Sequence, residues 1–169
     1  MRNKNMENRN MKILIISDTH GHNRELEKVL DKIGPIDALI HCGDVEGQED
    51  YIAALAGCET FIVAGNNDYF SDLPKEMKFV IDGKKILLTH GHYYGVSLGN
   101  EKMLEEGRAH DVDIVMFGHT HRPCLKQYDD ITLLNPGSLS YPRQQGRRPS
   151  FMIMEIDKRG ILHYTTKFL

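Results

Sequence analysis

Side chains that commonly bind metal ions follow five apolar segments of this sequence, and each stands close to a glycine. These side chains belong to Asp18, His20, Asp44, Asn66, His90, His119 and His121. Imidazole nitrogens with carboxylate and amide oxygens bind divalent transition metals, whereas structural zinc sites are usually rich in thiolates. The set therefore predicts a catalytic metal centre and not a structural one.

The number of these side chains indicates two ions. A lone Asp after a strand is usually a turn former, and a lone His is usually structural. Seven such groups at one sheet edge would be unfavourable without a cation, and seven ligands crowd a single transition-metal ion. Two ions about 3.5–4 Å apart are the usual device for displacement at phosphorus. The residues therefore predict two-metal phosphoryl chemistry.

Alternating strands and helices in the first part of the chain must position these residues. Continuous apolar runs at 11–16, 38–42 and 60–64 predict buried strands. Helical spacing at 23–33 and 48–56 predicts two helices between them. This β-α-β-α-β order favours a parallel sheet, and sites in such sheets form at the carboxyl ends of the strands.

The rest of the chain is richer in strands. Hairpins are expected at 79–89, 125–134 and 151–166, with a helix at 100–109 and a buried strand at 114–117. The pattern therefore predicts an α/β fold with a strand-rich second half.

Length and composition predict one globular domain over 11–169, preceded by a polar N-terminal extension at 1–10. The chain has 169 residues, of which 40% are hydrophobic and 27% charged. Its net charge of -3 gives no nucleic-acid signal, and its apolar runs are too short to span a membrane. Three separated cysteines without a CxxC motif favour free thiols in a reducing compartment, so we expect a cytoplasmic protein.

Taken together, the motifs resemble those of the calcineurin-like metallophosphoesterases, and more narrowly the small single-domain bacterial and archaeal phosphodiesterases. The matching motifs, within 11–168, are Asp18-x-His20, Gly43-Asp44, Gly65-Asn66-x-Asp68, His90 in THGH, Gly118-His119-Thr120-His121 and Asn135-Pro136-Gly137-Ser138. The resemblance implies a four-layer α/β/β/α sandwich of two mixed β-sheets flanked by helices.

The resemblance also implies how the ligands divide. The first ion would be held by Asp18, His20, Asp44 and His121. The second would be held by Asp44, Asn66, His90 and His119, with Asp44 bridging. A hydroxide between the ions would attack phosphorus in line in a small phosphodiester substrate. We expect Mn²⁺ or Ni²⁺, with Fe, Zn²⁺ and Co²⁺ as alternatives.

One position departs from the broad superfamily pattern, although such variation is familiar in the small phosphodiesterases. Asn67 stands where many members carry a histidine that is thought to protonate the leaving oxygen. His92 is the candidate substitute acid, with a capping role as the alternative. Asp68 joins Asp44, Asn66 and His92 among the candidate catalytic residues because it could orient a neighbour; the alternative is a plain turn acid.

Three functions are compatible with these residues. A phosphodiesterase is favoured over a phosphomonoesterase acting on a small metabolite. The third function is a non-catalytic scaffold that binds proteins; a retromer subunit that resembles this family is regarded as such a scaffold. It fits less well because the ligand set is complete here. The sequence is also compatible with a homo-oligomer, either a dimer or a tetramer.

The segment that carries Arg143, Arg147 and Arg148 has two interpretations. A solvated basic loop near a subunit contact is favoured over a phosphate-binding role.

Overall fold

The structure, a computed structural model, describes residues 10–169, so the predicted extension at 1–10 lies outside the described residues except for Asn10. In chain order the elements are β1 (Met11–Ile16), α1 (Arg24–Ile33), β2 (Ala38–His41), α2 (Glu49–Ala56), β3 (Glu59–Ile62), β4 (Glu76–Ile81), β5 (Lys84–Thr89), the 3₁₀ helix η1 (His92–Tyr94), α3 (Glu101–Ala109), β6 (Ile114–Met116), β7 (Pro123–Gln127), β8 (Thr132–Pro136), β9 (Ser150–Ile156) and β10 (Leu162–Phe168).

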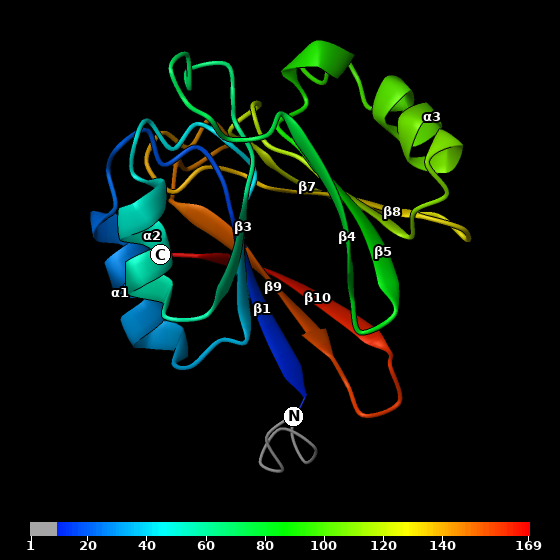
Figure 1. The fold of residues 1–169 in the computed structure, drawn as a ribbon, viewed down its shortest axis with the longest axis horizontal. Helices are drawn as coiled ribbons and strands as arrows, with labels where there is room; N and C mark the ends of the chain where they lie inside the picture. The colour runs from blue at the N-terminus through cyan, green and yellow to red at the C-terminus, as the bar shows by residue number, and fades with distance from the viewer. Residues whose placement is uncertain (1–9) are drawn as a thin grey trace.

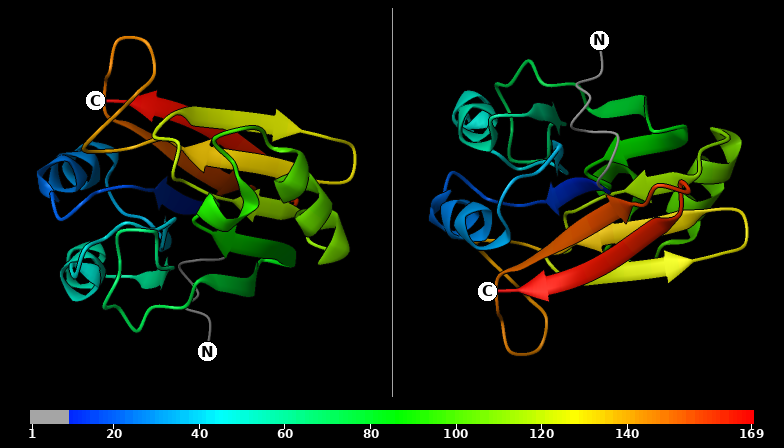
Figure 2. Two further views of the ribbon diagram at one scale, coloured as in Figure 1. Left: turned by 90° about the horizontal axis from the view of Figure 1, so that it is seen from above. Right: turned by 90° about the horizontal axis from the view of Figure 1, so that it is seen from below.

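These strands form two mixed five-stranded sheets (Figures 1 and 2). The first sheet has the order β10-β9-β1-β2-β3, in which β1, β2 and β3 are parallel and β9 and β10 are antiparallel additions. The second has the order β4-β5-β6-β8-β7, with β5, β6 and β8 parallel and an antiparallel partner at each edge. The predicted parallel β-α-β-α-β unit is therefore confirmed.

Three apolar layers hold the sheets and helices together. Ile13 and Ile15 of β1 pack in the cluster between the two sheets, whereas Leu14 and Ile16 pack in the cluster beneath α1 and α2. A third cluster, which includes Met103, joins α3 to the second sheet. Since alternate residues of a strand face opposite sides, burial on both faces explains the unbroken apolar run of β1. Figure 1 shows the resulting α/β/β/α sandwich, which confirms the predicted fold class.

The predicted boundaries shift where pairing overrides the local pattern. The strand expected at 60–64 is β3, which begins and ends earlier, and the hairpin expected at 125–134 extends further because Pro123 pairs with Pro136. The helix η1 was not predicted; glycines at positive φ, Gly91 and Gly95, flank it. No helix among residues 10–169 is both long and apolar enough to cross a membrane.

Candidate metal centre

The seven candidate ligands meet at one end of the two sheets, where five strands end. They are Asp18 and His20 after β1, Asp44 after β2, Asn66 after β3, His90 after β5, and His119 and His121 after β6. Both sheets therefore contribute ligands to one site. The sequence pattern placed these ligands at strand ends but did not show that the strands belong to two sheets.

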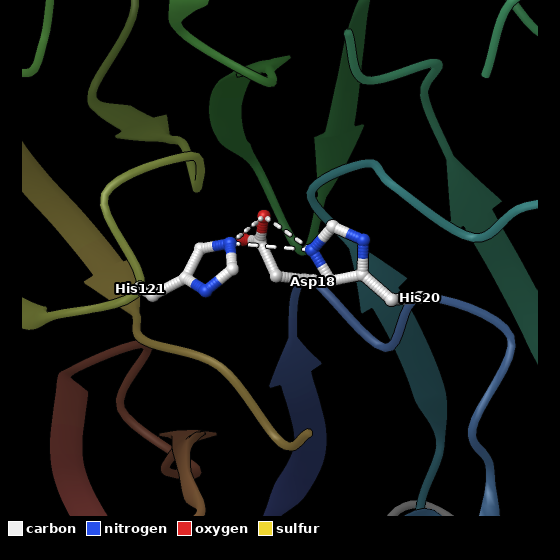
Figure 3. Close-up of side chains that lie close together, drawn as sticks. All are labelled: Asp18, His20 and His121. Carbon is white, nitrogen blue, oxygen red and sulfur yellow. Dashed lines mark hydrogen bonds and ion pairs between the residues drawn. The ribbon is translucent and has the colours of Figure 1, made fainter. Parts of the chain in front are cut away.

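Asp18, His20 and His121 form the first group of ligand atoms (Figure 3). His121 Nε2 lies 3.0 Å and His20 Nε2 lies 3.8 Å from Asp18 Oδ1. The two imidazole Nε2 atoms are 3.2 Å apart, and Asp44 Oδ2 is 3.7 Å from His20 Nε2. Figure 3 shows the three side chains pointing toward a common centre.

Asp44 and His90, which with Asp18 make the other compact set of ligand atoms, lie next to Asn66 and His119; these four residues are called the second group below. Asn66 Oδ1 lies 3.0 Å from His90 Nε2 and 2.9 Å from His119 Nδ1. His90 Nε2 is 3.5 Å from Asp44 Oδ2 and 3.9 Å from Asp18 Oδ1. Both carboxylates therefore lie close to His20 of the first group and to His90 of the second. In each case the Asp44 oxygen is nearer to the imidazole nitrogen than the Asp18 oxygen is.

Hydrogen bonds to the outer nitrogens fix three of the imidazole rings. The Nδ1 atoms of His90 and His121 donate to the carbonyls of Cys42 and Tyr141, each at 2.7 Å, and His20 Nδ1 donates to the Glu46 carboxylate at 2.8 Å. Since these acceptors hold the proton on Nδ1, each neutral ring turns the lone pair of Nε2 toward the centre. Metal-binding histidines commonly have this arrangement.

Two observations show that the donor set fits a cation. The Nε2 lone pairs of His20 and His121 face each other across 3.2 Å, which is unfavourable unless a cation or proton lies between them. Asp18 Oδ1 is fully buried and accepts no hydrogen bond from the described residues. Burying an oxygen in this state costs free energy, which a bound cation would offset.

The charges of the site also favour a cation. Burial raises the pKa of the Asp44 carboxyl, but His90 and the two N–H groups of Asn67 outweigh burial and lower that pKa. Burial lowers the pKa of His90, and the Asp44 and Asp18 carboxylates outweigh this effect and raise it. The ionised carboxylates therefore stabilise positive charge at the place where the imidazoles converge.

Backbone strain is concentrated at the same residues. Five of the seven candidate ligands have φ between 48° and 69°; they are Asp18, His20, Asp44, His119 and His121. Non-glycine residues rarely adopt this left-handed conformation, and such strain gathers at functional sites. Close packing adds to it, since a Cβ at Gly65 would lie 2.0 Å from Asp44 Oδ1 and one at Gly118 would lie 2.0 Å from Ser17 Oγ.

Asp68 binds the backbone of Asp44, and Asn67 binds its carboxylate. The Asp68 carboxylate accepts backbone N–H groups from Asp44, Glu46 and Gly65 at 2.7–2.9 Å. Asn67 donates its backbone N–H to Asp44 Oδ1 at 2.9 Å and its amide Nδ2–H to Oδ2 at 2.8 Å. This geometry favours an orienting role for Asp68 over that of a plain turn acid.

His92 lies beside the second group, at the start of η1. Its ring centroid is 5.3 Å from that of His90 and 6.0 Å from that of His119. The buried Nδ1 has no hydrogen-bond partner among the described residues. Burial, followed by His90 and His119, lowers the pKa of the ring. His92 is therefore close enough to take part in the site, whereas exposed His22 contacts Tyr141.

Glu46 is a residue that the sequence reasoning missed. It lies at φ 53°, outside any strand, and its carboxylate orients His20. The only sign of this role in the sequence is that Glu46 is an acidic residue two positions after Asp44.

Replacing Glu46 with glutamine is expected to weaken Mn²⁺ affinity by about 10- to 100-fold, because the carboxylate that fixes the His20 ring is lost. Metal titration by calorimetry would measure this, with exposed Glu105→Gln as the matched control; equal affinities would contradict it.

His41 is fully buried in β2. Its Nδ1 accepts the Gly43 N–H at 3.1 Å, so Nε2 carries the proton and faces Thr19 Oγ1 at 2.9 Å. Burial lowers the pKa of His41 from 6.5 to about 4.

This burial predicts a pH-dependent stability. Between these two pKa values the unfolded chain binds the extra proton, so the free energy of unfolding rises with pH there. The stability is present above pH 6.5 and is expected to fall by up to roughly 3 kcal/mol toward pH 4. Urea unfolding across this range should show a weaker pH dependence in His41→Gln than in the unmodified chain or in exposed His163→Gln. Parallel pH profiles for all three proteins would exclude the effect.

Comparison with known proteins gives a consistent family. Residues 11–159 match the model of the calcineurin-like phosphoesterase superfamily domain. The chain is 32% identical to the probable metallophosphoesterase YsnB of Bacillus subtilis, over 87% of this chain and 85% of that protein. It is 31% identical to the phosphodiesterase MJ0936 of Methanocaldococcus jannaschii, over 75% and 83%. Among solved structures, wild-type Vps29 of Entamoeba histolytica complexed with Zn²⁺ superposes with a TM-score of 0.73 at 27% identity, covering 94% of this chain and 99% of that one.

Proposed function

We propose that this chain, which belongs to the calcineurin-like phosphoesterase superfamily and is a metal-dependent phosphoesterase, hydrolyses small phosphodiesters with the help of two divalent ions. The observation that supports the proposal is the convergence of seven candidate metal ligands, among which the carboxylates of Asp18 and Asp44 lie close to imidazoles of both groups. The 11–169 domain boundary and a cytoplasmic location belong to the same proposal; free Cys42, Cys58 and Cys124 support the location.

The first ion would be held by Asp18, His20, Asp44 and His121. The second would be held by Asp44, Asn66, His90 and His119. Divalent ions held there would supply Lewis acidity, which would lower the pKa of the attacking water and offset charge on the phosphoryl oxygens. Mn²⁺ and Ni²⁺ remain the ions we propose, since nitrogen and oxygen ligands suit both.

Residues of the chain itself keep this arrangement in place. Asn67 and Asp68 hold Asp44 through its carboxylate and its backbone, so the carboxylate is oriented before substrate binds. Glu46 and the carbonyls of Cys42 and Tyr141 orient the imidazoles. His92 is the side chain we propose as proton donor to the leaving oxygen, because it lies beside the second group and its buried Nδ1 is unpaired.

A diester is favoured over a monoester because position 67 carries an amide engaged with Asp44, in place of an acid directed at a leaving group. The test compares kcat/KM for bis(p-nitrophenyl) phosphate and p-nitrophenyl phosphate, both with Mn²⁺. We expect the diester to be hydrolysed at least about tenfold more efficiently. A higher kcat/KM for the monoester would overturn the diesterase proposal, and hydrolysis of neither would favour the scaffold function.

A further inference from the structure

A cavity of about 750 Å³ opens beside the first group of candidate ligands. His20 and His121 form part of its wall, and three arginines, Arg122, Arg143 and Arg147, form another part. The cavity therefore brings cationic side chains next to the proposed metal centre. The sequence alone had favoured a solvated basic loop for Arg143 and Arg147.

The three guanidinium groups have no partner within residues 10–169: none makes an ion pair or a side-chain hydrogen bond there. Glu46 is the acidic residue of the cavity wall, and its carboxylate is already bonded to His20. Arg148 of the same loop differs, because its Nε donates to the Leu169 carbonyl at 2.9 Å and its guanidinium lies over the Phe168 ring. In a chain of net charge -3, the cavity thus concentrates uncompensated positive charge.

The loop that carries two of these arginines is attached directly to a candidate metal ligand. Arg143 donates its backbone N–H to the His121 carbonyl at 2.9 Å, and His121 Nδ1 donates to the Tyr141 carbonyl at 2.7 Å. Arg147, at φ 44°, closes a turn by donating its N–H to the Gln144 carbonyl at 3.0 Å. Figure 2 shows this loop, between β8 and β9, as the orange hairpin-like segment beside the C-terminus. The backbone of Arg143 is therefore held at a fixed position relative to His121.

We propose that this cavity binds a second phosphate group, carried by the same molecule as the scissile diester. Guanidinium groups pair with phosphate through two parallel hydrogen bonds, and a terminal phosphate offers three acceptor oxygens and nearly two negative charges. The preferred substrates are then phosphodiesters that bear an additional phosphate, such as a nucleoside 5′-diester with a 3′-phosphate. This inference rests on the proposed phosphodiesterase function.

The test uses two substrates with the same leaving group. Thymidine 5′-(p-nitrophenyl phosphate) is compared with its 3′-phosphorylated form on the full chain loaded with Mn²⁺. We expect the 3′-phosphate to raise kcat/KM by about tenfold or more, mainly through KM, because charge-assisted hydrogen bonds are added in the bound state. Arg143→Ala and Arg147→Ala should each reduce this preference, and the double variant should bring the ratio close to one. Arg148→Ala, from the same loop, should leave the ratio unchanged.

A binding measurement separates the two proposals. Calorimetry should show tighter binding of thymidine 3′,5′-bisphosphate than of thymidine 5′-phosphate, with the difference lost in the Arg143→Ala/Arg147→Ala protein and partly kept in Arg143→Lys. If both diesters are hydrolysed equally well and the arginine variants keep that equality, the second-phosphate subsite is wrong while the phosphodiesterase function stands. If neither diester is hydrolysed but the bisphosphate binds tightly through the arginines, the subsite stands and the phosphodiesterase function is wrong.

Discussion

Replacing Asp44 with asparagine is expected to lower kcat/KM for bis(p-nitrophenyl) phosphate about a thousandfold. Its Oδ2 lies 3.5 Å from His90 Nε2 and 3.7 Å from His20 Nε2, so both proposed ions would lose the same carboxylate charge. A loss of about 4 kcal/mol of transition-state stabilisation corresponds to this change in rate. Steady-state kinetics with saturating Mn²⁺ would measure it.

The control for this variant is exposed Asp72→Asn, for which we expect unchanged kinetics. Thermal unfolding of both variants shows whether Asp44→Asn remains folded, since the asparagine keeps the shape of the side chain. A loss smaller than about tenfold in a folded Asp44→Asn protein would be incompatible with a carboxylate shared by two catalytic ions.

Removal of metal is expected to have an effect of similar size. Dialysis against a chelator should lower the hydrolysis of bis(p-nitrophenyl) phosphate by roughly a thousandfold, because the proposed ions would supply the Lewis acidity of the reaction. Addition of Mn²⁺ or Ni²⁺ should restore it, and titration should saturate near two equivalents for each chain. Elemental analysis gives the bound metal independently of activity.

Metal should also stabilise the fold, because it binds the assembled site and not the unfolded chain. At a free Mn²⁺ concentration 100 times the Kd, the gain is about 2.7 kcal/mol in the free energy of unfolding. Asp44→Asn should show a smaller gain, and Asp72→Asn the full one. Undiminished activity after chelation, or no measurable metal binding, would contradict the proposed metal centre and leave the scaffold function as the alternative.

The elements of the fold could largely be predicted, since each strand of the parallel unit carries its own apolar run. Burial on both faces makes Ile13 to Ile16 uniformly hydrophobic, and that signal needs no knowledge of distant residues. Strand limits were less predictable because they depend on the partner strand, as the pairing of Pro123 with Pro136 illustrates. The helix η1 depends on glycine conformations that flank it, and these leave no periodic pattern.

The candidate site was predictable to a similar degree. The types and order of the seven side chains follow from the sequence, because each stands just past an apolar strand. Their partners do not: Glu46 reaches His20 across 26 positions, and Asn67 reaches Asp44 across 23. Contacts between residues so far apart depend on how the chain folds, so the sequence alone did not predict a role for Glu46.

The sequence by itself determined the fold class, the set of candidate ligands and the metal-dependent phosphoesterase chemistry, because local patterns and residue types carry that information. Only the tertiary structure decided which residues orient those ligands, and which way the imidazole lone pairs point. It also showed that exposed Arg143 and Arg147, on the loop predicted to be solvated, line the cavity beside His121. The physical reason is that charge, lone pairs and cavities act through space, and the distances between them are set only when the two sheets pack together.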